Sequence, residues 1–192
     1  MSADSFEIRA VVRRCLDGDQ SAMLELVAHY QGQVFGLCYR MLCQRQDAED
    51  ATQETFLRVL RNLDRWDSER DFEPWLLAIA GNRCRTALAK RKRAPRSEVL
   101  AEDRVEDPSA ETQAAEQLAE ELRMGLGHLR TEYREAFVLY HDHERSYLEI
   151  AEIMSCPVGT IKTWVHRARK ELISHLQRRN VIQERRHAVR TV

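Results

Sequence analysis

Residues 146–172 constrain the fold of this chain more than any other stretch. Two apolar stripes at helical spacing follow one another there, the first made by Ile150, Ala151 and Met154 and the second by Ile161, Val165, Ala168 and Leu172. Ser155, Cys156 and Pro157 separate the stripes, and such residues are typical of a tight turn. Pro157 suits the start of the second helix, because its missing N–H would have no partner in a first turn. The stretch therefore predicts a helix-turn-helix.

The second of these helices has a basic outer face. With its apolar stripe turned inward, the side chains left on or near the outside are Thr160, Lys162, Thr163, Trp164, His166, Arg167, Arg169 and Lys170. Residues 160–179 carry six Lys or Arg and one acid, Glu171. The alternative is an ordinary helical hairpin whose basic face is merely solvated. The charge imbalance favours binding to DNA phosphates, so we expect this face to contact DNA.

The residues of this stretch resemble a known family. The segments SYLEIA (146–151), PVGTIK (157–162) and HRAR (166–169) resemble the C-terminal, promoter-reading domain of sigma factors of the extracytoplasmic-function (ECF) type. The resemblance implies that the basic face reads the −35 element of a promoter. Trp164 departs from the family pattern, which usually has Arg or a similar polar residue there.

Composition indicates a helical, soluble protein. Only 7 Gly and 4 Pro occur in 192 residues, and the long runs free of both favour helices over a turn-rich β architecture. The length suits one larger domain or two small ones. No apolar run approaches the length that spans a bilayer, and the N-terminus lacks the apolar core of a signal peptide. We therefore expect a cytoplasmic protein that does not associate with a membrane.

Nothing in the sequence indicates catalysis, a cofactor or a metal. The five cysteines are scattered and form no C-x-x-C pair, which favours reduced, packed thiols. His141 and His143 flank Asp142, but alternate residues of a helix do not share a face. A glycine-rich phosphate loop and a nucleophile elbow are absent from the sequence. We expect no enzyme, no catalytic residue, no metal site and no cofactor.

The N-terminal part begins with a predicted amphipathic helix that ends near residues 16–19. A second helix follows, and its density of apolar residues predicts burial on more than one side. A third follows at residues 46–63, where acids and amides gather near the helix start: Asp47, Glu49, Asp50, Gln53 and Glu54. One interpretation is that they only stabilise the helix N-terminus. However, DAEDATQETF (47–56) resembles the polymerase-binding helix of sigma region 2. The resemblance implies that these side chains bind the clamp helices of the largest subunit of core RNA polymerase.

A polar loop with embedded aromatic residues is predicted next, at residues 64–75. For Trp66 and Trp75 the residues favour a role as core anchors over DNA binding. The motif FEPWL (72–76) resembles the family's F-x-x-W-L, with Asp71 and Phe72 at the tip of the loop. The resemblance implies that the loop captures unstacked bases of the −10 element, and aromatic rings can stack on such bases.

A basic helix is predicted to follow the loop, from Leu76 until Pro95 ends it. Seven of the fourteen residues from 83 to 96 are basic, which favours a track along DNA phosphates. Gly81 stands where the family usually has a long side chain, so we expect one phosphate contact fewer. The residues expected to bind the −10 element are Trp66, Asp71, Phe72, Asn82, Arg83, Arg85, Lys90 and Arg91.

The predicted organisation is all-α, with two small helical domains joined by a flexible acidic linker. The first domain spans residues 1–96 and the linker residues 97–108. The helix-turn-helix domain spans residues 109–177, and a basic tail spans residues 178–192. Within the second domain, Arg130 and Glu144 replace the family's usual Pro and Gly, so we expect a differently shaped turn before Ser146.

The sequence thus predicts a bacterial transcription initiation factor that binds core RNA polymerase and promoter DNA, melts the −10 element, and has an anti-sigma factor as a further candidate partner. One alternative is a helix-turn-helix regulator that binds duplex DNA without polymerase. It has no use for an acidic face at residues 47–54. Another is a helical adaptor that binds only proteins, which has no use for the basic face of residues 160–170.

Overall fold

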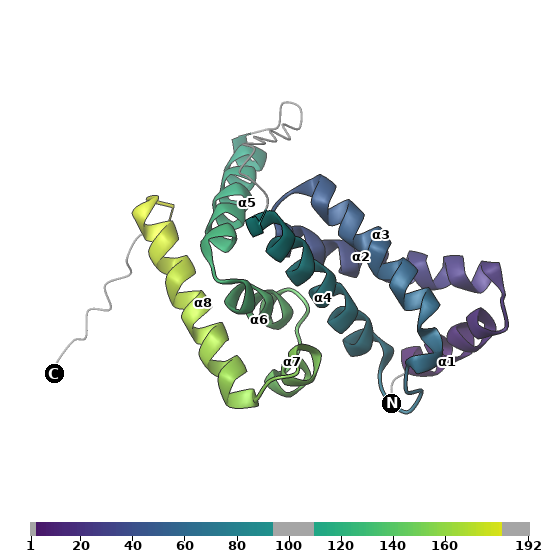
Figure 1. Ribbon diagram of the computed structural model, residues 1–192. Coiled ribbons are helices and arrows are strands. Elements are labelled where there is room, and N and C mark those ends of the chain that lie inside the picture. Colours follow the sequence, from purple (N-terminus) through teal and green to yellow (C-terminus); the bar gives the residue numbers. More distant parts are fainter. Residues whose placement is uncertain (1–2, 94–109, 182–192) are drawn as a thin grey trace.

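The computed structural model describes residues 3–93 and 110–181, and within those ranges its regular elements are all helical (Figure 1). The elements are α1 (Ala3–Leu16), α2 (Gln20–Leu42), α3 (Arg45–Arg61), a 3₁₀ turn η1 (Leu63–Arg65), α4 (Phe72–Arg93), α5 (Ala110–His128), α6 (Thr131–His141), α7 (Tyr147–Met154) and α8 (Val158–Arg178). The predicted all-α class is confirmed. The proposed linker, residues 97–108, and the tail from residue 182 lie outside the described residues.

The first helical unit, α1–α4, is assembled around α2. Asp19 caps the start of α2, because its Oδ1 accepts hydrogen bonds from the N–H groups of Ser21 and Ala22 at 2.8 and 3.2 Å. The helix ends at Cys43, which adopts a left-handed conformation with φ 58°. Along its length α2 contacts α1, α3 and α4, and its inward-facing residues Leu37, Cys38 and Met41 are fully buried.

The second helical unit, α5–α8, contains the predicted helix-turn-helix in α7 and α8. Ser146 and Glu149 form a capping box at the start of α7, and Ser155 ends that helix with φ 52°. In α8, all four residues of the predicted stripe are buried. In α7 the buried residues are Ile150 and Ile153, whereas Ala151 and Met154 are only half-buried against the core. All three residues of the first predicted stripe therefore face the core, and the prediction missed Ile153.

The loop before α4 is shorter than predicted. The helix begins at Phe72 rather than at Leu76, so FEPW forms its first turn. Pro74 is compatible with this position, because a residue in the first turn of a helix has no intrahelical partner for an N–H group. The change converts Phe72 from a loop tip into a helical residue that is 4% exposed.

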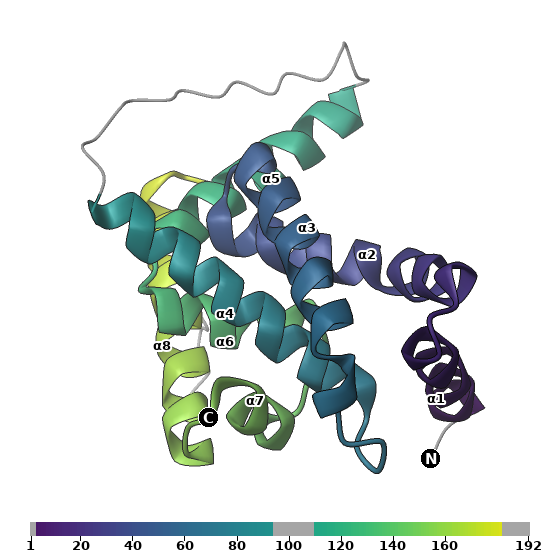
Figure 2. The same cartoon turned by 45° about the vertical axis from the view of Figure 1, so that its right-hand side comes forward.

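The two helical units pack against each other. Figures 1 and 2 show α4 along the boundary, with α3 on one side and α6 and α7 on the other. Helix α4 contacts α6 and α7, α2 contacts α5 and α6, and a single cluster of buried apolar side chains runs through both units. The described part of the chain is therefore one compact body with a shared core.

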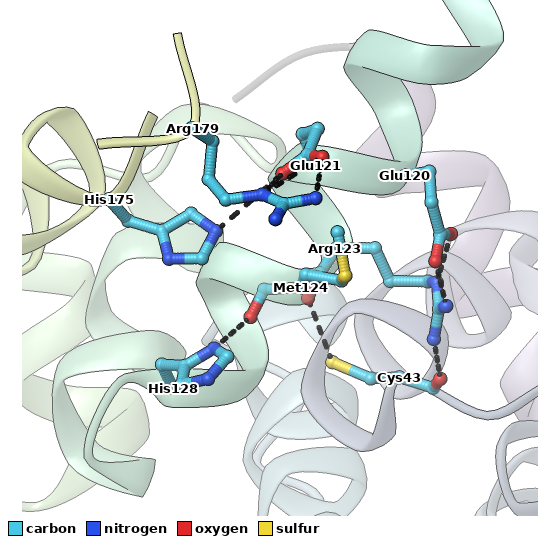
Figure 3. A network of polar contacts seen from close by, with 8 residues as sticks. All are labelled: Cys43, Glu120, Glu121, Arg123, Met124, His128, His175 and Arg179. Atoms are coloured by element: carbon cyan, nitrogen blue, oxygen red, sulfur yellow. Dashed lines mark hydrogen bonds and ion pairs between the residues drawn. The ribbon is translucent and has the colours of Figure 1, made fainter. Parts of the chain in front are cut away.

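Polar contacts of α5 reinforce this arrangement on two sides (Figure 3). Toward the first unit, Arg123 Nη1 donates to the Cys43 carbonyl at 2.6 Å, and the Cys43 thiol lies 3.6 Å from the Arg123 carbonyl. Toward the end of α8, Arg179 forms an ion pair with Glu121 at 2.8 Å. The guanidinium of Arg179 lowers the pKa of Glu121 through its hydrogen bonds.

The cysteines, the turn before Ser146 and the apolar content of the helices can be compared with the predictions. All five cysteines are free thiols, and Cys15, Cys38 and Cys84 are buried. Glu144, in the turn between α6 and α7, has φ 52°, a left-handed conformation that glycine adopts at much lower cost. The turn thus keeps a backbone shape suited to Gly while carrying Glu. Among the described residues, no helix is both apolar and long enough to cross a bilayer.

Candidate nucleic-acid and polymerase interfaces

The acidic side chains of α3 lie on one surface that borders α4, and three of the five are ion-paired. Glu49 pairs with Arg45 at 3.0 Å, Asp47 with Arg91 at 3.7 Å, and Glu54 with Arg83. Asp50 and Gln53 are exposed, and the described part of the chain offers neither side chain a hydrogen bond or ion pair. We call the five residues Asp47, Glu49, Asp50, Gln53 and Glu54 the α3 acidic face. Asp50 and Gln53 are its most accessible members.

Leu57 extends the α3 acidic face and was not among the predicted site residues. Leu57 is 54% exposed and adds apolar area beside the acidic groups. It lies seven residues after Asp50 and three after Glu54, so it falls on the same side of the helix. That spacing is the sequence signal by which Leu57 could have been assigned to this face. An exposed leucine beside acids and an amide is suited to contact a protein and not DNA.

The aromatic residues around the loop form a packed cluster. The Phe72 ring centroid lies 5.3 Å from those of Tyr30 and Trp66 and 5.5 Å from that of Trp75. Trp66 is 9% exposed, and its Nε1 has no hydrogen-bond partner among the described residues. Asp71, beside this cluster, is exposed. In this structure the rings of Trp66 and Phe72 are therefore covered, and a role in binding bases stays a prediction.

A cavity of about 1030 Å³ adjoins this cluster. One wall comes from the first unit and includes Trp66, Asp71 and Trp75. The opposite wall comes from the second unit, where Arg145 precedes α7 and Glu149 and Ile153 lie on it. Arg145 reaches across to Glu73 at 3.6 Å. Charged groups from both units thus line the cavity, which lies at their boundary.

The predicted −10 residues of α4 differ in how far they are exposed to solvent. Asn82, Lys90 and Arg91 are exposed, whereas Arg83 and Arg85 are half-buried. Arg83 is paired with Glu54 of the α3 acidic face. Arg85 donates hydrogen bonds to Asn82 of its own helix and to Glu135 of α6. The structure brings the predicted −10 residues of α4 together on one helix, but all three of these arginines, Arg83, Arg85 and Arg91, already have carboxylate partners.

The outer face of α8 is open to solvent. Its exposed members are Lys162, Thr163, His166, Arg167, Arg169 and Lys170, while Thr160 and Trp164 are half-buried. Arg167 Nη1 donates to the Tyr133 hydroxyl at 2.9 Å, and Arg169 Nη2 lies 3.3 Å from His141 Nε2. Burial and the nearby Arg169 lower the pKa of His141. All eight predicted residues lie on or beside one basic surface.

Fold and surface together define a class of protein. Two helical units share a core, one displays an acidic and apolar face on α3, and the other holds a basic helix outward from a helix-turn-helix. No group of His, Cys, Asp and Glu side chains within the described ranges is arranged to hold a metal ion. These features define a helix-turn-helix DNA-binding protein with an additional surface for a protein partner.

Comparison with known proteins identifies the family. The Sigma-70 region 2 model matches residues 26–94, and the Sigma-70 region 4 model matches residues 119–172. The ECF RNA polymerase sigma factor SigW of Bacillus subtilis is 31% identical over 184 residues, which cover 88% of this chain and 97% of SigW. The chain belongs to the sigma-70 family and is a sigma factor of the ECF type, as the sequence predicted.

Solved structures show a similar fold. CnrH, in complex with the cytosolic domain of CnrY, superposes with a TM-score of 0.64 at 26% identity, covering 88% of this chain and 97% of CnrH. The sigma factor RpoE of Bartonella quintana, in complex with the anti-sigma factor NepR, gives a TM-score of 0.66 at 24% identity and covers 80% of this chain and 95% of RpoE. The second likeness shows the fold alone.

Proposed function

We propose that this chain binds core RNA polymerase through the α3 acidic face and directs the enzyme to promoters in the cytoplasm. Helix α8 reads the −35 element, and α4 with the preceding loop holds the −10 element. The observation that carries this proposal is the presence, on one chain, of an exposed acidic and apolar face on α3 and an exposed basic face on α8. The protein supplies recognition, and the polymerase supplies catalysis.

The chemistry of the two faces assigns them to different partners. DNA phosphates repel carboxylates, so Asp50 and its neighbours are unsuited to a DNA contact, while exposed Leu57 favours a protein surface. Conversely, the lysines and arginines of α8 release counterions from DNA when they neutralise phosphates. A helix-turn-helix regulator that acts without polymerase accounts for α8 and leaves the face of α3 without a role.

The test is run-off transcription with purified core polymerase on a promoter library. We expect specific transcripts only when this chain is added. A variant with Asp50→Arg and Gln53→Arg should lose co-purification with core polymerase and the run-off products. Its helical circular dichroism and its binding to duplex promoter DNA should not change. These two positions are preferred to Glu54, because a charge reversal at Glu54 would also break its ion pair with Arg83.

Glu7→Arg is the matched control, because it reverses an exposed carboxylate on α1, away from α3. It should leave co-purification and transcription unchanged. If the Asp50→Arg and Gln53→Arg variant still binds polymerase and still initiates, the assignment of α3 is wrong. If the unmodified chain binds promoter duplex yet never supports initiation, the regulator without polymerase becomes the better description.

An anti-sigma factor is the second proposed protein partner. RpoE shares the fold of this chain, and its solved structure is a complex with such a factor, NepR. A factor that covers the α3 acidic face would compete directly with polymerase. Co-purification of this chain from its own cells tests the idea, with the Asp50→Arg and Gln53→Arg variant losing a partner that uses the same face.

A further inference from the structure

A buried carboxylate of the second unit forms an ion pair with an arginine of the first. Glu135 on α6 is 0% exposed, and its Oε1 accepts a hydrogen bond from Arg85 Nη1 on α4. The other oxygen, Oε2, is also buried and has no partner among the described residues. Burial raises the pKa of Glu135, and the charge of Arg85 opposes that rise. Arg85 is thus the group that makes a carboxylate tolerable at this position.

Gly81 is the residue that admits the carboxylate. It is buried on α4 one turn before Arg85, and a Cβ atom there would overlap Glu135 Oε1 and lie 3.3 Å from Glu135 Cδ. Gly81 was expected to cost a phosphate contact, and in the structure it instead allows α6 to approach α4 closely. The overlapping atom is the end of the Glu135 side chain, so a methyl group at residue 81 would require this carboxylate to leave its present position beside Arg85.

Two further ion pairs join the first helical unit to the second. Arg40 of α2 is ion-paired with Asp142, which follows α6. Arg145, before α7, lies 3.6 Å from Glu73 of α4. Buried apolar residues of both units form one cluster around these contacts. The ion pair between Glu135 and Arg85 is therefore part of an extended interface between α4 and the second unit.

We propose that, in the chain free of polymerase, α6 covers the −10-binding surface of α4, with Glu135 in the place that a DNA phosphate takes when Arg85 binds DNA. This closed state rests on the proposed role of α4 in holding the −10 strand. Arg85 becomes available only when the two units separate. Gly81 permits the closed state, since a Cβ atom at this position would overlap the Glu135 carboxylate.

The experiment compares two glycine substitutions on the full chain. Gly81→Ala adds a methyl group where it overlaps Glu135, whereas Gly36→Ala adds one to α2 at a site with nothing within 4 Å. Both changes raise helix propensity equally. Binding of fluorescein-labelled single-stranded DNA of random sequence is measured by anisotropy, and the radius of gyration by small-angle X-ray scattering.

We expect Gly81→Ala to expand the chain and to bind single-stranded DNA about tenfold more tightly, the usual scale for freeing a hydrogen-bonded charged group. Gly36→Ala should behave like the unmodified chain. In a chain that carries both Gly81→Ala and Arg85→Ala the gain should disappear, because the freed group is absent. A folded Gly81→Ala chain that stays compact, or that expands without tighter binding, would overturn the proposal.

If Gly81→Ala fails to fold, as shown by loss of its helical circular dichroism, a second variant tests the proposal. Glu135→Gln keeps the shape of the side chain and removes its charge, which weakens its contact with Arg85 and should let the two units separate more readily. We expect tighter single-strand binding here too, and unchanged binding overturns the closed state. Run-off transcription separates this proposal from the proposed function. Its failure with the unmodified chain would reject the sigma role, while scattering and anisotropy would still decide whether α6 covers α4.

Discussion

At the scale of single residues, Trp164 shows how a departure from the family pattern is accommodated. It lies three residues after Ile161 and one before Val165, which is at the edge of the buried stripe of α8. In the structure the ring is half-buried, packs against the core and lies 6.3 Å from the ring of Tyr133. Tyr133 also accepts a hydrogen bond from Arg167. A buried tyrosine therefore positions two residues of the DNA-facing surface.

Trp164→Arg tests whether this position selects bases. An indole offers one donor and apolar contact, whereas arginine can bond bidentately to guanine or reach a phosphate. We expect the fold to persist, the selected −35 sequence to change at one or two positions, and the salt dependence to rise by about one phosphate. Selection from a random duplex library and a salt titration measure this. An unchanged sequence and salt slope, with a lower melting temperature, would make Trp164 a packing residue.

Phe72→Ala tests the buried aromatic cluster. The ring is 4% exposed and lies against Tyr30, Trp66 and Trp75, so its removal leaves a cavity in the core. We expect the free energy of unfolding to fall by about 3–5 kcal/mol, as for other buried phenylalanines. Urea denaturation measures the loss. A loss below about 1 kcal/mol, together with reduced permanganate reactivity at the −10 element, would instead favour a DNA-binding role.

Sequence reasoning was limited here by contacts between distant residues. The order of apolar and polar positions along α8 follows helical periodicity, so all eight candidate residues could be placed on one surface. The ion pair between Glu54 and Arg83 joins residues 29 positions apart, and nothing local indicates it. The same is true of Glu135 and Arg85, which are 50 positions apart.

At the scale of elements, helix starts with capping residues were predictable. Asp19 and the pair Ser146 and Glu149 mark their helices through hydrogen bonds within a few residues. The start of α4 was missed because Pro74 was interpreted as part of a loop. A proline two residues into a helix is equally compatible with the sequence, and the burial of Phe72 against α2 decides between the two.

Glu144→Gly tests the turn between α6 and α7. The left-handed backbone at Glu144 disfavours a side chain by roughly 1–2 kcal/mol, part of which is offset by the greater freedom of glycine in the unfolded chain. We expect a net gain in the free energy of unfolding of about 1 kcal/mol. As a control, Glu152→Gly on exposed α7 backbone should lower stability by about as much. A destabilised Glu144→Gly chain would mean that the glutamate side chain has a structural role.

At the scale of the whole molecule, the sequence predicted two helical units and left their packing open. The residues that join them were interpreted within their own units. Arg134 of α6 is an example. In the structure this residue is 6% exposed, and its guanidinium donates to the carbonyls of Met41 in α2 and of Gly127 and Leu129. Periodicity within a helix carries no information about such a partner.

Arg134→Met tests whether the units unfold together. The shared core predicts a single calorimetric transition for the unmodified chain, with equal calorimetric and van't Hoff enthalpies. Loss of the guanidinium would leave carbonyls of both units without a donor, so we expect a loss of about 2–4 kcal/mol and two separable transitions. Arg130→Met, at an exposed position before α6, should change little. A single unchanged transition in Arg134→Met would show that this arginine does not couple the units.

The cavity beside Trp75 has a thermodynamic consequence, because its two walls belong to different units. It exists only while the units are in contact, so any small molecule that binds there selects the closed state. At a concentration one hundred times its dissociation constant, such a ligand would favour that state by about 2.7 kcal/mol. Because Trp66, Asp71 and Phe72 also line this cavity, a compound bound there would hold the two units together and cover part of the predicted −10 surface at the same time.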